Sequence, residues 1–311
     1  MAGAVAAADL GLSAGPDRGT YYRFGQDLSR LLKPNGINIT VYSSNGAVDN
    51  IHNIHAITER PDIQLGIVQS DVVATIASRQ RNPGTQPLGE DVHLVLPLYD
   101  EEVHIVARRG INELKGLAGG YVAIGHEGSG TYLTAVALFR LAGVVPAAMI
   151  TIDGAEALAQ LRAGRIDAMV YVAGRPLRLL RDAVKPADAF VLVPVTSPAI
   201  LDAYAPSEIP AGTYPWQSTA VPTVAVTALL VAHDPGRRYC ETIGQVARHV
   251  IAGLGWLVNN GHPYWKRVDV QRPVKGWEPY DCVRDYVNSP AAAITHRAPM
   301  TDVIEGEDSA R

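Results

Sequence analysis

The chain has 311 residues and a formal net charge of −4, with 47% hydrophobic and 19% charged residues. A chain of this length buries about three quarters of the surface that it exposes when unfolded, and it commonly folds as two domains. The negative net charge and the lack of a basic run argue against a nucleic-acid-binding protein. The longest apolar run, Thr223–Ala232, is too short to cross a bilayer as a helix.

The chain begins with a run of small apolar residues, Ala2–Ala8, that leads into Asp9. The run is similar to the end of a secretory signal without its charged and long apolar regions, and Ala6-Ala7-Ala8 fits a small-residue cleavage site. The alternative is an unstructured leader with no targeting role. We expect residues 1–9 to be the remainder of a signal or a tail, and the protein to be exported to the periplasm.

Apolar runs alternate with segments of helical spacing along most of the chain. Strands are predicted at 10–14, 37–42 and 63–68, each followed by a polar turn and a helix. Further β-prone segments lie at 92–106, 121–124, 166–172, 191–195 and 223–231. Residues 198–222, rich in Pro and Tyr, are expected to form irregular loop, and a helical pattern begins at Arg238. The alternation predicts an α/β fold with mostly parallel sheets.

The two longest β-prone runs, 92–106 and 223–231, stand between two similar series of strands and helices. This arrangement indicates two α/β lobes that face each other across a cleft, with the two runs as crossovers between them. The chain then crosses twice, so the first lobe is discontinuous. We predict that residues 10–104 and 225–311 form lobe I and that residues 105–224 form lobe II.

The turns that follow the predicted strands are polar. Ligands bind at the carboxyl ends of the strands in open α/β sheets, so these turns are the expected binding region. None of them carries an obvious nucleophile next to a base, and we therefore predict no catalytic residue, no cofactor and no metal. The turns are 15–20, 43–46, 69–71, 125–131 and 173–175.

The most glycine-rich of these turns is Gly125-His126-Glu127-Gly128-Ser129-Gly130-Thr131, between a predicted strand and a predicted helix. At such a junction the first N–H groups of the helix have no partner, and the helix dipole favours negative charge. The stretch is not a Walker loop, because Thr131 stands where that motif needs Lys. It is not a nucleophile elbow, because Glu127 occupies the first glycine position around Ser129. We predict an anion cradle, and the alternative is an ordinary turn capped by Ser129.

Seven short motifs follow one another along the chain. They are Gly19–Tyr22, Ser44–Asn50, Gly66–Val72, Gly128–Thr131, Arg165–Ala168, Ile209–Pro215 and Val221–Val226. In this order they resemble the TAXI family of solute receptors for TRAP transporters, over residues 10–260. The chain departs from the family pattern at Asp17-Arg18, Arg23, His126-Glu127 and Arg175, where charged residues replace small residues or proline.

The resemblance implies a fold of the periplasmic binding protein type II-like class, with two α/β lobes, a two-strand hinge and a ligand cleft between the lobes. It implies a monomeric extracytoplasmic receptor for a small organic anion, a dicarboxylate or an acidic amino acid such as glutamate or 2-oxoglutarate. The receptor would deliver this ligand to the membrane permease subunits of a TRAP transporter, and no nucleic acid is expected as a partner. The alternatives are a sensory ligand-binding module of the same fold and, less favoured, a two-lobed enzyme that uses Ser129 or His126.

The turns and the resemblance together give the candidate ligand-binding residues. These are Thr20, Tyr21, Ser44, Asn45, Gly46, Ala47, Gln69, Ser70, Glu127, Ser129, Gly130, Thr131, Gly174, Arg175 and Tyr214. The N-terminal ends of the two helices after Ser44–Ala47 and Gly128–Thr131 are expected to face the same cleft and to favour a carboxylate.

Several side chains have roles that the sequence leaves open. Arg18 and Arg175 are candidates for holding a second carboxylate, but Arg175 alternatively forms an ion pair with Glu127 or Asp71. Glu127 would repel a second carboxylate and attract an ammonium group. Tyr214 is a candidate lid over the cleft, while Pro215 and Trp216 beside it are alternatively packing residues. Cys240 and Cys282 form either one disulfide or two separate buried thiols.

Overall fold

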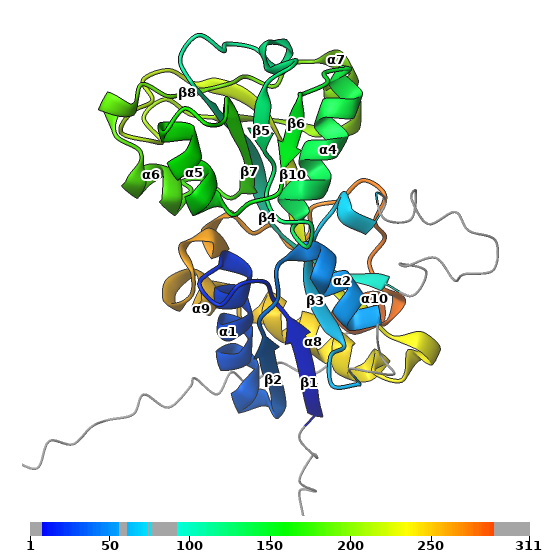
Figure 1. Cartoon of the computed structure of the whole chain (residues 1–311). Coiled ribbons are helices and arrows are strands. Elements are labelled where there is room, and N and C mark those ends of the chain that lie inside the picture. Colours follow the sequence, from blue (N-terminus) through cyan, green and yellow to red (C-terminus); the bar gives the residue numbers. More distant parts are fainter. Residues whose placement is uncertain (1–7, 56–60, 74, 76–91, 289–311) are drawn as a thin grey trace, which may run out of the picture.

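The computed structural model describes residues 8–55, 61–73, 75 and 92–288 (Figure 1). The predicted signal remainder at 1–7 and most of the helix predicted after Asp71 lie outside the described residues. Ala8 and Asp9 already belong to the first strand, where they pair with Ile37 and Asn38. Among the described residues, no helix has the length and apolar character that a membrane crossing requires.

The described strands form one mixed sheet in the order β2-β1-β3-β10-β4-β7-β5-β6, with β8 paired to β4 and β9 to β10. β1, β2 and β3 pair in parallel, as do β5, β6 and β7, while β4 and β10 run antiparallel to their neighbours. The strands are β1 (Ala8–Ser13), β2 (Ile37–Tyr42), β3 (Leu65–Gln69), β4 (Val92–Ala107), β5 (Tyr121–Ala123), β6 (Ala148–Ile150), β7 (Ala168–Ala173), β8 (Val191–Leu192), β9 (Ala205–Ile209) and β10 (Val221–His233).

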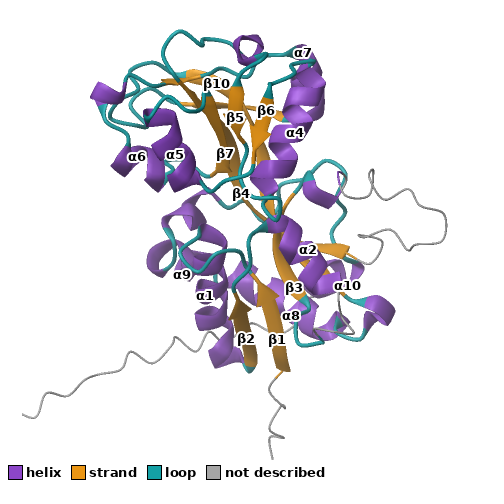
Figure 2. Ribbon diagram, in the orientation of Figure 1, coloured by secondary structure: helices purple, strands orange, loops and turns teal. Residues whose placement is uncertain are grey.

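Helices cover both faces of this sheet (Figure 2). They are α1 (Thr20–Leu32), α2 (Ala47–His55), α4 (Gly130–Ala142), α5 (Gly154–Arg162), α6 (Arg178–Ala183), α7 (Pro198–Ala203), α8 (Cys240–Ala252), α9 (Leu254–Asn260) and α10 (Asp281–Asn288). The expectation of irregular loop over 198–222 was wrong for part of that range, because α7 and β9 form there. Pro198 stands in the first turn of α7, where the missing N–H of proline removes no helical hydrogen bond.

The molecule has two α/β lobes joined by β4 and β10 (Figure 1). One part of β10 pairs with β3, and the other part pairs with β9. β4 pairs with β10 along most of its length and with β7 from Glu102 to Ala107. This confirms the two-lobe fold class with a two-strand connection, and the crossovers predicted at 92–106 and 223–231. The exact lobe boundaries, at 104/105 and 224/225, stay a prediction.

Successive residues of the two crossover strands are buried on opposite faces of the sheet. Leu229 and Leu230 of β10 belong to different apolar clusters, and so do Ile105 and Val106 of β4. Strands that are covered on both faces show long apolar runs rather than alternation, which is why both crossovers could be read from the sequence. In the first lobe, Phe24 of α1 stacks on Trp265, with ring centroids 4.3 Å apart.

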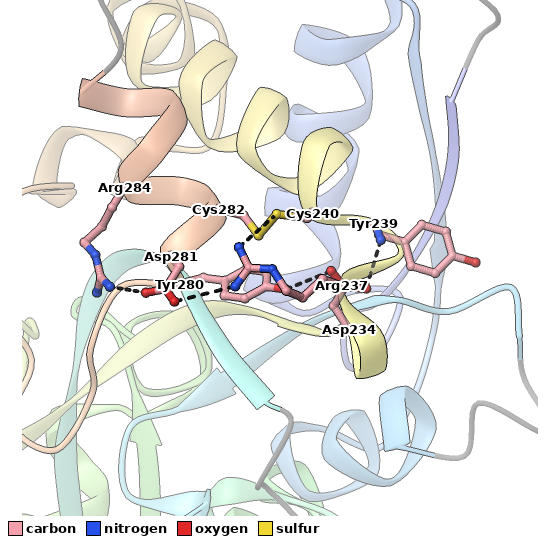
Figure 3. Close-up of a disulfide and its surroundings, with 8 residues drawn as sticks. All are labelled: Asp234, Arg237, Tyr239, Cys240, Tyr280, Asp281, Cys282 and Arg284. Atoms are coloured by element: carbon pink, nitrogen blue, oxygen red, sulfur yellow. Dashed lines mark hydrogen bonds and ion pairs between the residues drawn. A yellow bond between two sulfur atoms is a disulfide. The ribbon is translucent and has the colours of Figure 1, made fainter.

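A disulfide joins Cys240, at the start of α8, to Cys282 in α10 (Figure 3). The two Cα atoms are 5.3 Å apart, and the bond closes a loop across 42 positions of sequence. Around it, Asp234 accepts hydrogen bonds from the Tyr239 backbone and from the Tyr280 hydroxyl, each at 2.9 Å. The structure therefore selects the disulfide from the two alternatives and fixes α10 against α8.

We expect the double substitution Cys240→Ala/Cys282→Ala to lower the free energy of unfolding by about 4 kcal/mol. The reason is the chain entropy that a loop of this length regains in the unfolded state. Urea unfolding monitored by circular dichroism measures the loss, and wild-type protein treated with a reductant is the matched control. Equal unfolding midpoints for the oxidised wild type and the double variant would contradict a stabilising disulfide between α8 and α10.

Candidate ligand-binding site

A cavity of about 710 Å³ lies between the two lobes and is lined by the start of α1 on one side and by the starts of α5 and α6 on the other. One wall comes from the first lobe and is built by Pro16, 18–21, Arg23, 45–47, Gln69, Tyr99, Glu101 and 262–264. The other wall comes from the second lobe and includes residues of the glycine-rich turn, the start of α5, the end of β7 and the start of α6. The cavity therefore occupies the position that the sequence predicts for a ligand cleft.

Four helices of nine or more residues begin at the cavity wall, in addition to the six-residue α6, which begins at Arg178. The first residues of the four longer helices, Thr20 of α1, Ala47 of α2, Gly130 of α4 and Gly154 of α5, all line it. The Ser129 side chain caps α4 by accepting from the Tyr132 N–H at 3.3 Å, while α1 begins without a side-chain cap. Each helix start carries a partial positive charge, so the four together favour an anion in the cavity.

The charged side chains of the cavity wall are mainly cationic. Arg18 and Arg23 come from the first lobe and make no ion pair with another described residue, and Arg178 and Arg181 come from α6. Arg178 and Arg181 share Asp182 as an ion-pair partner, with Nε–O distances of 3.3 and 2.7 Å. The excess of guanidinium groups agrees with the helix dipoles and again favours an anionic ligand.

Glu101 of β4 is a buried carboxylate in the wall of this cationic cavity. Its Oε2 accepts from the Tyr21 hydroxyl at 2.7 Å, and its Oε1 accepts from the Tyr99 hydroxyl at 3.4 Å. It makes no ion pair with any other described residue. Burial raises the pKa of Glu101 to about 7, against the smaller opposing effect of hydrogen bonds from Tyr21, Gln69 and Tyr99.

The next residue, Glu102, is buried on the other face of β4 and has two cationic partners. Its Oε1 lies 2.7 Å from Nε of Arg175 and 2.5 Å from Nη2 of Arg267. Arg175 thus pairs with Glu102 and does not line the cavity, so neither Glu127 nor Asp71 is its partner. The partner was not visible in the sequence, because it lies 73 positions away on a strand read as apolar.

The structure brings most of the candidate ligand-binding residues together at the cavity. Their roles toward a ligand stay a prediction. Those that line the cavity are Thr20, Tyr21, Asn45, Gly46, Ala47, Gln69, Ser129, Gly130, Thr131 and Gly174.

The remaining candidates lie outside the lining. Ser44 donates a hydrogen bond to Asn50, and Ser70 accepts one from the backbone of Thr227. Glu127 is exposed at the surface. Tyr214 is 0% exposed, and its hydroxyl donates to Nε2 of His104 at 2.7 Å, which makes it a packing residue and not a lid.

Sequence reasoning missed several lining residues, namely Tyr99, Glu101, Asp153, Tyr171, Arg178, Arg181, His262 and Tyr264. The signal for Glu101 was present, since Asp100, Glu101 and Glu102 interrupt an otherwise apolar β-prone run. His262 and Tyr264 fall beyond the range of the family resemblance, and no local pattern marks them.

Glycines allow the two lobes to touch beside the cavity. The Asp49 N–H at the start of α2 donates to the Gly128 carbonyl at 3.4 Å. A Cβ atom at Gly128 would overlap Asp49, and one at Gly130 would overlap the Gln69 side-chain amide. Gly130 is a candidate ligand-binding residue from the sequence, and in the structure a side chain at this position would meet Gln69 of the opposite lobe.

Residues 12–236 match the profile of the NMT1-like family. Among solved structures, MatC from Rhodopseudomonas palustris with bound malate superposes with a TM-score of 0.51, at 16% identity over 85% of this chain and 90% of that one. The periplasmic binding protein BugD superposes with a TM-score of 0.51, at 15% identity over 83% of this chain and 85% of that one. At this identity the likeness shows a shared two-lobed fold.

The Glu101 carboxyl should make the difference in unfolding free energy between the wild type and Glu101→Gln depend on pH. Because the pKa of Glu101 is raised from 4.5 to about 7, the folded state holds this proton more tightly than the unfolded state. The contribution of this proton to the stability of the folded state is fully present below pH 4.5 and is lost as the pH rises through 7. We therefore expect the stability of Glu101→Gln relative to wild type to increase between pH 4.5 and pH 8, by up to about 3 kcal/mol.

Thermal unfolding of the ligand-free proteins across this pH range measures the difference. Glu127→Gln, which neutralises an exposed carboxylate outside the cavity, is the matched control and should follow the wild type at each pH. A difference between wild type and Glu101→Gln that stays constant with pH would contradict the raised pKa.

We expect Gly130→Val to hold the lobes apart, because the new side chain would occupy the position of the Gln69 amide. Small-angle scattering should give a larger radius of gyration for this variant than for the wild type. Gly255→Val in α9 is the control, since a Cβ atom at Gly255 would meet nothing within 4 Å. Identical scattering profiles for Gly130→Val and wild type would rule out a steric role at this contact.

Proposed function

We propose that the chain, which belongs to the NMT1-like family, is an extracytoplasmic solute receptor that binds a small organic anion between its lobes. The observation that carries this proposal is the interlobe cavity, at which the N-termini of α1, α2, α4 and α5 and four arginines converge. Of the structural relatives, BugD is a periplasmic binding protein, and MatC was solved with malate bound. These observations favour a receptor over an enzyme that uses Ser129 or His126.

The proposed ligand is a dicarboxylate or an acidic amino acid of the glutamate or 2-oxoglutarate kind. One carboxylate would lie at the starts of α1 and α4, where Thr20, Gly130 and Thr131 line the cavity. A second carboxylate would pair with the arginines, of which Arg18 and Arg23 have no other ion-pair partner among the described residues. Bidentate pairing of a guanidinium with a carboxylate is both strong and specific in direction.

The proposed partner is a membrane permease of the TRAP type, which would take the ligand from a monomeric receptor in the periplasm. The resemblance to the TAXI family supports this partner. The disulfide between Cys240 and Cys282 supports the compartment, because such bonds form and persist in oxidising environments. Crossing strands β4 and β10 would act as the hinge about which the lobes close on the ligand.

Titration calorimetry on C4 and C5 dicarboxylates, acidic amino acids, neutral sugars and cationic amino acids tests the proposal. We expect the acids to bind and to raise the melting temperature, because the ligand binds only the folded protein. Ser129→Ala should weaken binding by roughly 0.5–1.5 kcal/mol, the range for one net hydrogen bond. Ser197→Ala, at the start of α7 and outside the lining, is the control and should leave binding unchanged.

Tight binding of a neutral sugar, together with no heat from any acid and no effect of Ser129→Ala, would overturn the proposed function. Scattering profiles that stay the same when a tight acid is added would overturn the proposed hinge closure alone.

A further inference from the structure

Two adjacent glutamates on β4 have different electrostatic surroundings. Glu101 is 5% exposed and Glu102 is 1% exposed, so both carboxylates are removed from bulk water. Glu102 is neutralised by Arg175 and Arg267. Glu101 has only neutral hydrogen-bond donors, from Tyr21, Tyr99 and Gln69.

A buried carboxylate without a cationic partner is unfavourable unless a cation joins it. Every partner of Glu101 among the described residues also lines the cavity, so the open side of this carboxylate is the cavity itself. The group that completes its charge balance would therefore come from a molecule bound there. Glu102 needs no cation from a ligand, because Arg175 and Arg267 already balance its charge.

The Gln69 side chain, which donates a hydrogen bond to Glu101, carries a second acceptor on the side of Gly130. Gln69 lines the cavity and is 3% exposed, and its Oε1 atom is buried without a hydrogen-bond partner. An ammonium group carries three N–H donors and no acceptor, so it satisfies a carboxylate and an amide oxygen together. A carboxylate or a keto oxygen in the same place would leave Gln69 Oε1 without a donor and would repel an ionised Glu101.

The surrounding side chains are aromatic. Tyr21, Tyr99, Tyr171 and Tyr264 line the cavity, and the charge of Glu101 contributes to a raised pKa of Tyr171, which places that ring nearby. The electron-rich faces of tyrosine rings attract a cation that has been taken out of water. The aromatic wall is thus compatible with an ammonium group next to Glu101.

From this arrangement we infer that the cavity contains a subsite for a protonated amine, formed by the Glu101 carboxylate and the Gln69 amide oxygen. The ligand is then a zwitterionic acidic amino acid and not a plain dicarboxylate or a 2-oxo acid. This inference rests on the proposed function, since the arginines and helix N-termini of the same cavity hold the carboxylates of that ligand.

Matched pairs of ligands that differ only by the amino group test the inference. The pairs are L-glutamate with glutarate and L-aspartate with succinate, titrated calorimetrically at pH 8, where the Glu101 carboxyl is ionised. We expect wild-type protein to bind the amino acid of at least one pair ten times or more tighter than its partner. Glu101→Gln should bring the two affinities within about threefold of each other, because the amide carries no charge for the ammonium.

Two control variants separate the charge of Glu101 from other effects. Glu127→Gln removes a carboxylate outside the cavity and should keep the wild-type preference. Glu101→Asp retains the charge and should keep a preference for the amino acid, although the shorter side chain reduces it. Circular dichroism checks that each variant is folded. If Glu101→Gln does not fold, the preference of the wild-type protein for the amino acid over the diacid tests the inference by itself.

The outcomes distinguish the inference from the proposed function. If no member of either pair binds wild-type protein, the proposed function fails. If the diacids bind as tightly as the amino acids, or more tightly, the proposed function holds and the amine subsite is overturned. A preference for the amino acid that persists unchanged in folded Glu101→Gln overturns the assignment of Glu101.

Discussion

The pairing of β4 with β10 is the constraint on which the rest of the structure depends. Their antiparallel register runs from Glu102 opposite Ala225 to Val92 opposite His233, across the join between the lobes. Because both strands belong to both lobes, they fix the distance at which the two sets of helices face each other. β4 also carries Tyr99 and Glu101 to the cavity wall, so the connection between the lobes and the site share the backbone of this strand.

The electrostatics of the site follow from alternation along β4. Adjacent residues of a strand point to opposite faces, so Glu101 faces the cavity while Glu102 faces Arg175 and Arg267. The Glu102 carboxylate pairs with both Arg267 and Arg175 and so connects the segment around Arg267 to the second lobe. The Glu101 carboxylate faces the cavity, where a ligand can contact it. Tyr264, close to Arg267 in sequence, donates from its hydroxyl to the Gly174 carbonyl at 2.7 Å and adds a contact between the lobes.

The sequence was informative where a local pattern determines the structure. Long apolar runs revealed both crossovers, and a glycine-rich turn between a strand and a helix revealed the start of α4 at the cavity. Side-chain pairs between distant segments were not predictable, because they depend on register and on the approach of the lobes. Arg175 pairs with a residue 73 positions away, and Tyr214 with one 110 positions away. Glu101 was overlooked because three consecutive acids in a β-prone run do not reveal which of them faces a cavity.

The central claim is that the interlobe cavity holds a small anion, with its carboxylates at the helix N-termini and arginines and its amine at Glu101. A crystal structure of the protein grown with L-glutamate, or with the tightest-binding acid of the calorimetric panel, tests this claim most directly. The account predicts that the acid lies between the lobes, in contact with the start of α1 or α4, and that any amino nitrogen lies within hydrogen-bond distance of Glu101. An acid bound outside the cavity, or one whose carboxylate contacts an ionised Glu101, would contradict it.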